Sequence, residues 1–396
     1  MILKSVKMKN FLSYKDETLF TMEATEDDEY DELNTFEDKT GKYLKSTLIF
    51  GANASGKTNL INAIDFLKEA INTSILANNS LKHLEPFKFD KKNTTEPITL
   101  EISVIIDEDE YRYGFAVLDN AVIREWFLKN EDRLFERISP SWEDIEVFEE
   151  FNEAEPIKRF TRKNALFIST TSALNELISM KFVAEITGGI NILRKNKDLD
   201  QIKDTMEYME KNPSVKNSIL EYLKKTDTGI EGLDCEEMNT IHNVYDNSKK
   251  VDEIRLSFMK YQSSGVKKLF IMLGPIFKTL SDGSVLLIDE IDSRLHPSIV
   301  RMILSMYNSI DLNPKKAQLI CSTHDVLLLD GDIRSDQVWF TEKNKYGATE
   351  LYSLADFEGI DKKDSILKSY LLGIYGAVPK RIYLSDMNME RGQGDV

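Results

Sequence analysis

A short glycine-bounded loop near residue 50 leaves this chain few choices of fold. The loop runs from Gly51 to Thr58 with the sequence GANASGKT, between an apolar run at residues 47–50 and a helical pattern that begins at Asn59. It matches G-x-x-x-x-G-K-[ST], and both flanks that this phosphate-binding pattern requires are present. We therefore expect a strand, a phosphate-binding loop and a helix to form the centre of an α/β domain.

The residues of this loop have separate physical roles. Gly51 and Gly56 permit backbone angles that are closed to other residues, so the main chain can approach a phosphate closely. Successive N–H groups turn inward to bind the anion, and the N-terminus of the following helix adds partial positive charge. Lys57 is expected to reach the β- and γ-phosphates, and Thr58 is expected to bind Mg²⁺. The predicted nucleotide-binding residues of the loop are Gly51, Asn53, Ser55, Gly56, Lys57, Thr58 and Asn59.

The charge, the apolar content and the cysteines of the chain argue against several classes of protein. The chain has 396 residues and a formal net charge of −16, which argues against a protein that coats DNA without specificity. No stretch is long and apolar enough to cross a bilayer, and the N-terminus lacks the sustained apolar segment of a signal peptide. Cys235 and Cys321 are the only cysteines, and their unrelated contexts favour neither a disulfide framework nor a zinc site. We expect a cytoplasmic protein with no membrane contact.

Alternating and charged stretches organise the first part of the chain. Residues 2–22 alternate like a strand pair, with Asn10 and Phe11 in the turn region. Residues 23–38 are crowded with Asp and Glu, and we interpret them as a solvated loop; a docking surface for a basic partner is the less favoured alternative. Three alternating runs between residues 98 and 128 predict an antiparallel meander.

The chain changes character after the meander. Helical spacing of apolar residues between positions 174 and 223 predicts two to four helices, too short for a long coiled-coil arm. We therefore divide the chain into residues 1–165 with the loop and the meander, residues 166–250 as a helical insertion or lid, and residues 251–396 as the second half of the α/β domain. The tail after Ser385 is polar, and we expect it to be disordered.

Two later strands carry the residues that are expected to complete the site. Val285–Ile288 is a continuous apolar run, as a strand buried on both faces should be, and it leads into Asp289 and Glu290. Such acids lie in the crevice at the carboxyl end of a sheet, where Asp289 would hold Mg²⁺ and Glu290 would activate the attacking water. His324 follows the buried strand Gln318–Ser322 and could sense the γ-phosphate, although a lone histidine there is more often structural.

A third group of small residues precedes the strand that leads into Asp289. Ser263, Ser264 and Gly265 open a helix, and two serines with a glycine at a helix N-terminus can bind an anion. An ordinary helix cap would look the same in isolation. Their position between the helical insertion and the Asp289 strand favours a role in nucleotide binding.

Together these motifs resemble those of ABC-type ATPase heads. Ser263–Gly265 resembles the ABC signature, Asp289–Pro297 resembles the end of a Walker B strand with its D-loop, and Ser322–His324 resembles the switch-histidine loop. The Asn10-Phe11 pair resembles the opening of chromosome-maintenance-type heads. Within this class the chain looks like the compact, AAA-labelled ATPases of prokaryotic anti-phage and abortive-infection systems (RloA/AbiL-like). It is more distantly similar to RecF, Rad50 and SMC heads.

Two further phrases, Leu84–Phe89 and Tyr370–Pro379, add to this resemblance with less specificity. The resemblance implies an α/β fold, namely an ABC-type P-loop NTPase head with a mixed sheet, an antiparallel β-subdomain and a helical insertion. It implies ATP and Mg²⁺ as cofactors. It also implies a sandwich in which Ser263, Ser264 and Gly265 of one head close over ATP on another, so the active unit is a homodimer or a higher homo-oligomer.

The resemblance also assigns roles and a partner. In the sandwich Lys57, Glu290 and His324 would be the catalytic residues: Lys57 supplies charge, Glu290 positions the water and His324 contacts the γ-phosphate. The resembled proteins work with a separately encoded effector, often a Toprim-like nuclease, and the chain ends soon after Pro379 without room for such a domain. We therefore expect an ATP-hydrolysing sensor or scaffold subunit of an anti-phage complex that controls a separate effector nuclease.

Three alternatives belong to other functional classes. A DNA-repair ATPase of the RecF or Rad50 type would act on DNA directly, but the acidic balance and the short insertion weigh against direct DNA binding. A transporter ATPase is disfavoured by the Asn10-Phe11 opening and by the run from Asp292 to Pro297. A structural protein that is clamped by ATP with negligible turnover is disfavoured by the intact Glu290.

Overall fold

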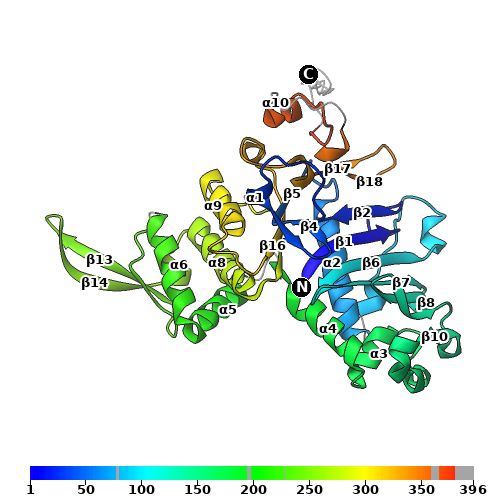
Figure 1. Ribbon diagram of the computed structural model, residues 1–396. Coiled ribbons are helices and arrows are strands. Elements are labelled where there is room, and N and C mark those ends of the chain that lie inside the picture. The colour runs from blue at the N-terminus through cyan, green and yellow to red at the C-terminus, as the bar shows by residue number, and fades with distance from the viewer. Residues whose placement is uncertain (77–79, 194–197, 227, 358–364, 380–396) are drawn as a thin grey trace, which may run out of the picture.

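A computed structural model describes residues 1–76, 80–193, 198–226, 228–357 and 365–379. Figure 1 shows a body built on two sheets, from which a β-ribbon projects to one side; the ribbon consists of β13 (Asn239–Asp246) and β14 (Lys249–Ser257). The predicted polar tail after Ser385 lies outside the described residues. None of the described helices combines the length and the apolar composition that a membrane span requires.

Six strands form the central sheet, in the order β11 (Ile190–Leu193), β15 (Val285–Ile288), β16 (Gln318–Ser322), β5 (Ser46–Gly51), β17 (Val338–Lys343) and β18 (Thr349–Ser353). The first five strands are parallel, and β18 runs antiparallel to β17 at one edge. The sheet is therefore mixed, as the fold class predicted from the sequence requires.

Alternating residues of the central strands enter two different cores, which explains their continuous apolar sequences. In β15, Val285 and Leu287 belong to one hydrophobic core, whereas Leu286 and Ile288 belong to the other. Successive side chains of a strand point to opposite faces, so a strand that is covered on both faces must be apolar throughout. The prediction of a strand buried on both faces is confirmed.

Seven antiparallel strands form a second sheet, in the order β10 (Ile145–Val147), β9 (Asp132–Arg137), β8 (Ala121–Lys129), β7 (Asp109–Leu118), β6 (Ile98–Ile106), β1 (Ile2–Lys9) and β2 (Thr18–Thr21). The predicted meander is confirmed and continues from β6, β7 and β8 into β9 and β10. The N-terminal strand pair joins the sheet because β1 pairs with β6. This sheet is the predicted antiparallel β-subdomain.

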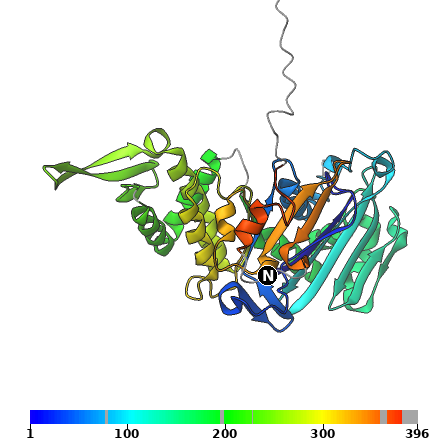
Figure 2. The same ribbon diagram turned by 90° about the horizontal axis from the view of Figure 1, so that it is seen from above.

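Helix α2 (Lys57–Thr73) lies between the two sheets and gives them a common core. Its apolar residues, such as Leu60 and Ile64, recur at helical spacing and are buried with residues of both sheets. The other face of the central sheet packs against α8 (Ser264–Asp282) and α9 (Pro297–Asn308). Figure 2 shows these helices on the side of the central sheet that faces away from the antiparallel sheet.

The described part of the predicted insertion, residues 166–250, contains four helices, where the sequence predicts two to four: α3 (Phe167–Ala173), which ends before the predicted helical spacing begins at Leu174, α4 (Leu177–Gly189), α5 (Asp198–Lys211) and α6 (Pro213–Lys225). They do not pack as one unit. α3 and α4 contribute to the core around α2, whereas α5 and α6 pack with α8 in the core on the other face of the central sheet. Strand β11 separates the two pairs. The division of the chain at residues 165 and 250 stays a prediction.

The end of the predicted helical insertion forms β structure instead. β12 (Gly232–Asp234) pairs with β13, and β13 pairs with β14, in an antiparallel three-stranded sheet. Most residues of β14 are exposed. The ribbon therefore lacks the one-sided apolar alternation by which a half-buried strand is recognised in a sequence. Helix α7 (Phe258–Tyr261) leads from the ribbon into α8.

The acidic residues of segment 23–38 are exposed or half-buried, in line with the predicted solvation, but the segment is folded and anchored rather than a loop throughout. Their elements, and the strand that pairs with them, are α1 (Asp31–Asn34), β3 (Thr35–Asp38) and β4 (Gly41–Leu44). The buried guanidinium of Arg334 donates hydrogen bonds to the backbone oxygens of Asp27 and Glu29 and to the Asp31 carboxylate. The sequence gives no sign of this anchor, because 303 positions separate Arg334 from Asp31.

Candidate functional site

The glycine-bounded loop joins β5 to α2 and lies closely against β17 and β18. Gly51 has a φ of 154° and Gly56 a φ of 123°, both in the region that favours glycine. A Cβ atom at Gly51 would lie 2.4 Å from the Thr341 backbone oxygen, and one at Gly56 would lie 2.4 Å from the Thr349 hydroxyl. Both positions therefore require glycine for conformation and for space.

A turn near the N-terminus, which carries Ser13 and Tyr14, holds this loop in place through hydrogen bonds. The Ser13 hydroxyl accepts hydrogen bonds from the Asn59 amide at 2.7 Å and from the Thr349 hydroxyl at 2.8 Å. The buried Tyr14 hydroxyl donates to the Gly56 backbone oxygen at 3.2 Å. Because the Asn59 side chain is bonded to Ser13, its predicted contact with a nucleotide would have to come from the backbone. The sequence analysis missed Ser13 and Tyr14, which carry no motif.

The Asn10-Phe11 pair and the Leu84–Phe89 phrase belong to one structural unit. The Asn10 side-chain oxygen accepts a hydrogen bond from the Phe87 backbone at 3.1 Å. The Asn10 amide donates to the backbone oxygens of Asn93 and Glu96 at 2.8 and 2.9 Å. A buried asparagine that satisfies three backbone groups holds the turn that carries Ser13. These two stretches, which carry part of the family resemblance, therefore help to hold the phosphate-binding loop in place.

Lys57 and Thr58 face the end of β15. The buried Lys57 ammonium donates to the backbone oxygens of Gly51 and Ala52 at 2.7 and 3.1 Å, so it lies inside the loop. The Thr58 hydroxyl donates to an oxygen of the Asp289 carboxylate at 2.9 Å. The structure thus brings together the two predicted Mg²⁺ ligands from positions 231 residues apart.

The donor set at this point fits Mg²⁺. A threonine hydroxyl and a carboxylate are hard oxygen ligands, which Mg²⁺ prefers, and it commonly takes only one or two carboxylates besides phosphate oxygens and water. Among the described residues, no group of three or more His, Cys, Asp or Glu side chains could hold a metal ion. Thr58 and Asp289 would therefore hold Mg²⁺ together with the phosphates of a nucleotide.

Ser322 at the end of β16 orients both acids of β15. Its hydroxyl donates to the second Asp289 oxygen at 2.5 Å and accepts from the Glu290 backbone at 2.8 Å. Glu290 has a φ of 54°, a left-handed conformation that costs free energy in a residue other than glycine and is often found at functional sites. Ser322 was predicted as the end of a buried strand and as part of the switch-histidine loop, but not as the residue that holds both acids of β15.

His324 begins the segment that leaves β16, and its backbone N–H donates to the Asp292 carboxylate at 3.1 Å. Burial and the positive charge of Lys57 lower the pKa of His324 below its ordinary value, while Asp292, Glu290 and Asp289 act in the opposite direction. The imidazole is therefore neutral at neutral pH, and it can donate or accept a hydrogen bond without carrying charge.

These groups surround a hollow of about 270 Å³ at the carboxyl end of the central sheet. The hollow is lined by Glu290, His324 and Lys343 together with the loop and first helical residues Asn53, Ala54, Ser55, Gly56, Lys57, Thr58 and Asn59. Ser55 is turned away, because its buried hydroxyl bonds the Thr341 hydroxyl at 2.5 Å. Lys343, at the end of β17, adds a cation that the sequence analysis missed. Ligands of parallel sheets bind at this end of the strands.

The signature residues lie outside this hollow. The Ser263 hydroxyl accepts from the Val266 backbone at 3.2 Å and caps α8, and both Ser263 and Ser264 are exposed. Gly265 lies beside the Arg294 backbone, where an added Cβ would be 3.1 Å from its oxygen. Within the described part of the chain, none of the three signature residues lines the hollow. Their contact with a nucleotide stays a prediction, as do the individual roles of the other site residues.

Comparison with known proteins identifies a family that this chain matches. A model of the family described as "AAA domain, putative AbiEii toxin, Type IV TA system" matches residues 46–330. The fold is similar to a solved structure described as the SmcHead bound to the C-winged helix domain of ScpA, with 14% identity over 89% of this chain and 97% of that chain and a TM-score of 0.46. It is also similar to the SMC head domain from Thermotoga maritima, with 13% identity over 89% and 99% of the two chains and a TM-score of 0.43. A search of curated proteins gives no match.

Proposed function

This chain belongs to the AAA-domain family described as putative AbiEii toxin, Type IV TA system, and we propose that it binds ATP with Mg²⁺ and hydrolyses ATP in a site completed by a second copy. One observation carries the proposal. Thr58 and Asp289 meet at 2.9 Å beside the phosphate-binding loop, and Glu290 and His324 line the same hollow. A phosphate cradle, a Mg²⁺ ligand pair and a carboxylate for water are the parts that phosphoryl transfer to water requires.

Each residue of the hollow has a task that its contacts permit. Lys57 stabilises negative charge on the β- and γ-phosphates, and its burial inside the loop strengthens that interaction. Glu290 orients the attacking water, with its backbone held by Ser322. The neutral His324 donates a hydrogen bond to the γ-phosphate. Bound Mg²⁺ would neutralise charge on the phosphate oxygens. The reaction then depends on positioning and electrostatics rather than on a covalent intermediate.

The second copy follows from the position of the signature. Ser263 and Ser264 are exposed at the N-terminus of a 19-residue helix, α8, but they do not line the hollow of their own chain. A helix N-terminus with serine hydroxyls attracts anions. In a head-to-head dimer this end of α8 would close over the γ-phosphate of the partner. We therefore propose a homodimer, or a higher homo-oligomer, with composite ATP sites.

The biological role we propose is that of a sensor or scaffold subunit in an anti-phage defence complex that controls a separate effector, such as a Toprim-like nuclease. The family, whose description includes an abortive-infection toxin and a toxin–antitoxin system, supports this role. ATP binding would change the contacts between heads, so its binding energy could hold or release the effector. Loss of phage protection in cells that express Lys57→Met, with protection retained by Glu26→Gln, is the expected result.

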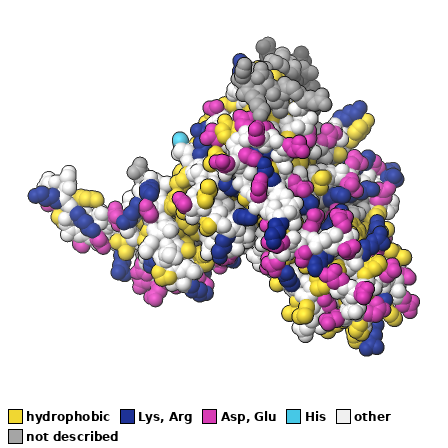
Figure 3. All heavy atoms as spheres, viewed as in Figure 1, with side chains coloured by type: hydrophobic (Ala, Val, Ile, Leu, Met, Phe, Trp, Pro, Cys, Tyr) yellow, Lys and Arg dark blue, Asp and Glu magenta, His cyan; other side chains and the backbone are white. Residues whose placement is uncertain are grey.

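Direct action on DNA is supported less. Figure 3 shows basic and acidic side chains interspersed over the visible face, without a large patch of one sign. On the antiparallel sheet, Arg112 pairs with Glu131, and Arg124 and Arg133 both pair with Glu136. Cations that are already paired bind phosphates less readily. A steep loss of DNA affinity with added salt would instead support the DNA-repair alternative.

Mass photometry and phosphate release of the wild type and Glu290→Gln test the ATPase. We expect the variant to release phosphate about 10²–10⁴-fold more slowly, because the group that positions and activates water is lost. It should also accumulate a dimer that depends on ATP and Mg²⁺. Glu26→Gln, which changes an exposed acid outside the hollow, is the control. A Glu290→Gln protein that fails to bind ATP, or turns it over at the wild-type rate, contradicts the assignment.

A further inference from the structure

Lys343 is a cation in the hollow beside the phosphate-binding loop that no sequence motif predicts. It is the last residue of β17 and lines this hollow with Lys57, Glu290 and His324. Lys343 is exposed, and within the described part of the chain its ammonium makes neither a hydrogen bond nor an ion pair. An ammonium with no acidic partner can bind an anion without first breaking an ion pair.

The side chain of Lys343 leaves β17 on the face that contacts the loop. Thr341, two positions earlier in β17, bonds the Ser55 hydroxyl at 2.5 Å. Side chains two positions apart along a strand lie on the same face. Thr349 is opposite Lys343 in the pair of β17 and β18, and its hydroxyl lies 2.7 Å from the Ser55 backbone oxygen. Since directly opposite residues also share a face, three side chains of this hairpin lie on the loop side.

The order of the strands places Lys343 and His324 on two sides of the loop. β5, which leads into the loop, pairs with β16 on one side and with β17 on the other. His324 follows the end of β16, and Lys343 ends β17. A phosphate chain that is held by the loop would therefore lie between an imidazole and an ammonium.

The strand end that carries Lys343 is held from its other face. The Glu342 carboxylate accepts a hydrogen bond from the Ala377 backbone at 3.1 Å. Phe340 stacks on Tyr370 with 5.5 Å between the ring centroids. Ala377 and Tyr370 belong to the late phrase that adds to the family resemblance, so this phrase helps to fix β17. A fixed backbone reduces the entropy that the lysine loses when it binds a ligand.

We propose that Lys343 binds the phosphates of ATP from the β17 side of the loop, as a second ammonium besides Lys57. The inference rests on the proposed function, because it names a further residue of the same site. Asp289 and Glu290 bring two carboxylates next to the phosphates, and Lys57 alone offsets one of them. With Lys343 the two ammonium groups match the two carboxylates, which leaves the charge of Mg²⁺ for the phosphates.

Two matched lysine variants test this assignment in a titration with a fluorescent ATP analogue and Mg²⁺. We expect Lys343→Met to weaken ATP binding about five- to tenfold, because a charged contact to phosphate is lost. Lys345→Met removes the same charge from an exposed lysine two positions further along, which does not line the hollow. Its ATP affinity should stay within about twofold of the wild type.

Two further measurements separate phosphate binding from a structural role of Lys343. Lys343→Arg keeps the positive charge, so its ATP affinity should stay within about threefold of the wild type. The difference in affinity between the wild type and Lys343→Met should shrink as the salt concentration rises, because salt screens an exposed charge. Thermal unfolding without nucleotide verifies that each variant is folded.

Three results would overturn the proposal: wild-type ATP affinity in Lys343→Met, equal weakening in Lys343→Met and Lys345→Met, or a loss that Lys343→Arg shares in full. The wild type separates these results from failure of the proposed function. A wild type that does not bind ATP would contradict both. A wild type that binds ATP with an affinity that does not depend on Lys343 would contradict this inference alone.

Discussion

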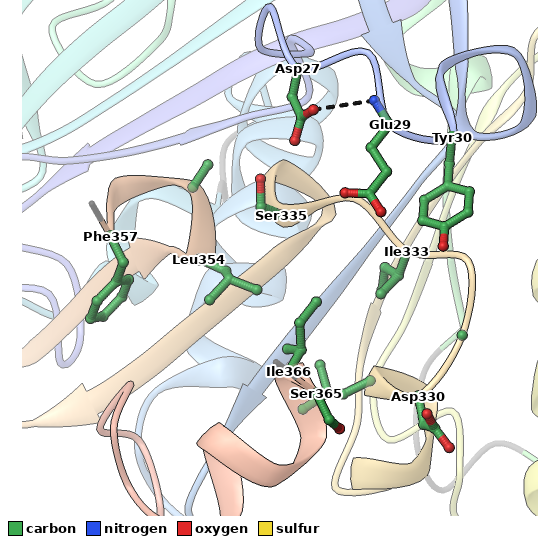
Figure 4. A pocket seen from close by; sticks show the side chains of 13 residues that line it. Asp27, Glu29, Tyr30, Asp330, Ile333, Ser335, Leu354, Phe357, Ser365 and Ile366 are labelled. Carbon is green, nitrogen blue, oxygen red and sulfur yellow. Dashed lines mark hydrogen bonds between the residues drawn. The ribbon is translucent and has the colours of Figure 1, made fainter. Parts of the chain in front are cut away.

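At the carboxyl end of the central sheet, the hollow that we propose binds ATP (the nucleotide hollow) is lined by residues at the ends of four strands: the loop after β5, Glu290 after β15, His324 after β16 and Lys343 at the end of β17. At the amino end, a second hollow of about 370 Å³ is lined by residues of the acidic N-terminal segment, of the connection before β17 and of the first turn of α10 (Ile366–Leu371) (Figure 4). The first hollow takes its form from the sheet itself. The second depends on one buried arginine that joins distant parts of the chain.

This difference predicts how each end responds to mutation. The groups of the nucleotide hollow are held by a loop and strands whose backbones are fixed by the core, so losing one side chain should change chemistry more than stability. The acidic segment 23–38 is held by the hydrogen bonds of Arg334, so losing that side chain should release the whole segment.

Arg334→Met should disrupt the hollow at the amino end of the central sheet, and we expect it to have the largest effect of the substitutions. Its removal takes the guanidinium away from the buried Asp336 carboxylate and from the backbone oxygens of Thr25, Asp27 and Glu29. We expect the free energy of unfolding to fall by about 3–5 kcal/mol, as measured by urea denaturation. Arg124→Met, which breaks the exposed pair with Glu136, is the control and should cost about 1 kcal/mol or less. Equal losses in the two variants would contradict the anchoring role.

Lys57→Met should affect only the nucleotide hollow at the carboxyl end of the central sheet. It removes one charged donor from the phosphates, so we expect ATP affinity to fall about 10- to 100-fold in a titration with a fluorescent ATP analogue. Wild-type ATP affinity in this variant would contradict the role of Lys57.

The same contrast explains how much could be predicted from the sequence. The nucleotide hollow could be found because each of its motifs is local: Gly51, Asp289 and His324 stand within a few residues of a strand end, and parallel strands bring such ends together. The acidic segment was interpreted as a solvated loop because its anchor, Arg334, stands outside any motif and is separated from Asp31 by 303 positions.

The prediction of the fold from the sequence was limited in the same way. Strands with two buried faces, such as Val285–Ile288, were predicted because burial makes them apolar throughout. The ribbon of β13 and β14 was missed, because β13 is mostly half-buried and β14 mostly exposed, so burial imposes no alternating pattern on them. The strand Ile190–Leu193 was also missed, since four residues are too short to show a period. Sequence patterns report burial, and they fail where burial does not select the residues.

Ser322→Ala tests whether a residue of the nucleotide hollow acts by positioning its neighbours. The variant loses the hydrogen bonds to the Asp289 carboxylate and to the Glu290 backbone, at 2.5 and 2.8 Å. Because Ser322 positions other groups, we expect phosphate release to slow about tenfold while the KM for ATP changes little. Ser305→Ala, which changes an exposed serine of α9 outside the hollow, is the control and should keep the wild-type rate. A change in KM alone would contradict the positioning role.

The smallest effect concerns His324, whose pKa is lowered first by burial and then by the charge of Lys57. The chain has four histidines, so NMR can follow each imidazole through a pH titration. In Lys57→Met the pKa of His324 should rise, because one of the two causes that lower it is removed. Lys343→Met removes a second cation that lines the same hollow and should shift this pKa less.

The sign of this shift also fixes a dependence of stability on pH. The unfolded chain binds a proton at His324 more tightly than the folded chain does, since the folded pKa is the lower one. The contribution of His324 to stability is therefore full above its ordinary pKa and declines as the pH falls toward the lowered value. His324→Gln should make the Tm less sensitive to pH in this window. A wild-type pKa at or above the ordinary value, or no rise in Lys57→Met, would show that Lys57 does not act on His324 across the hollow.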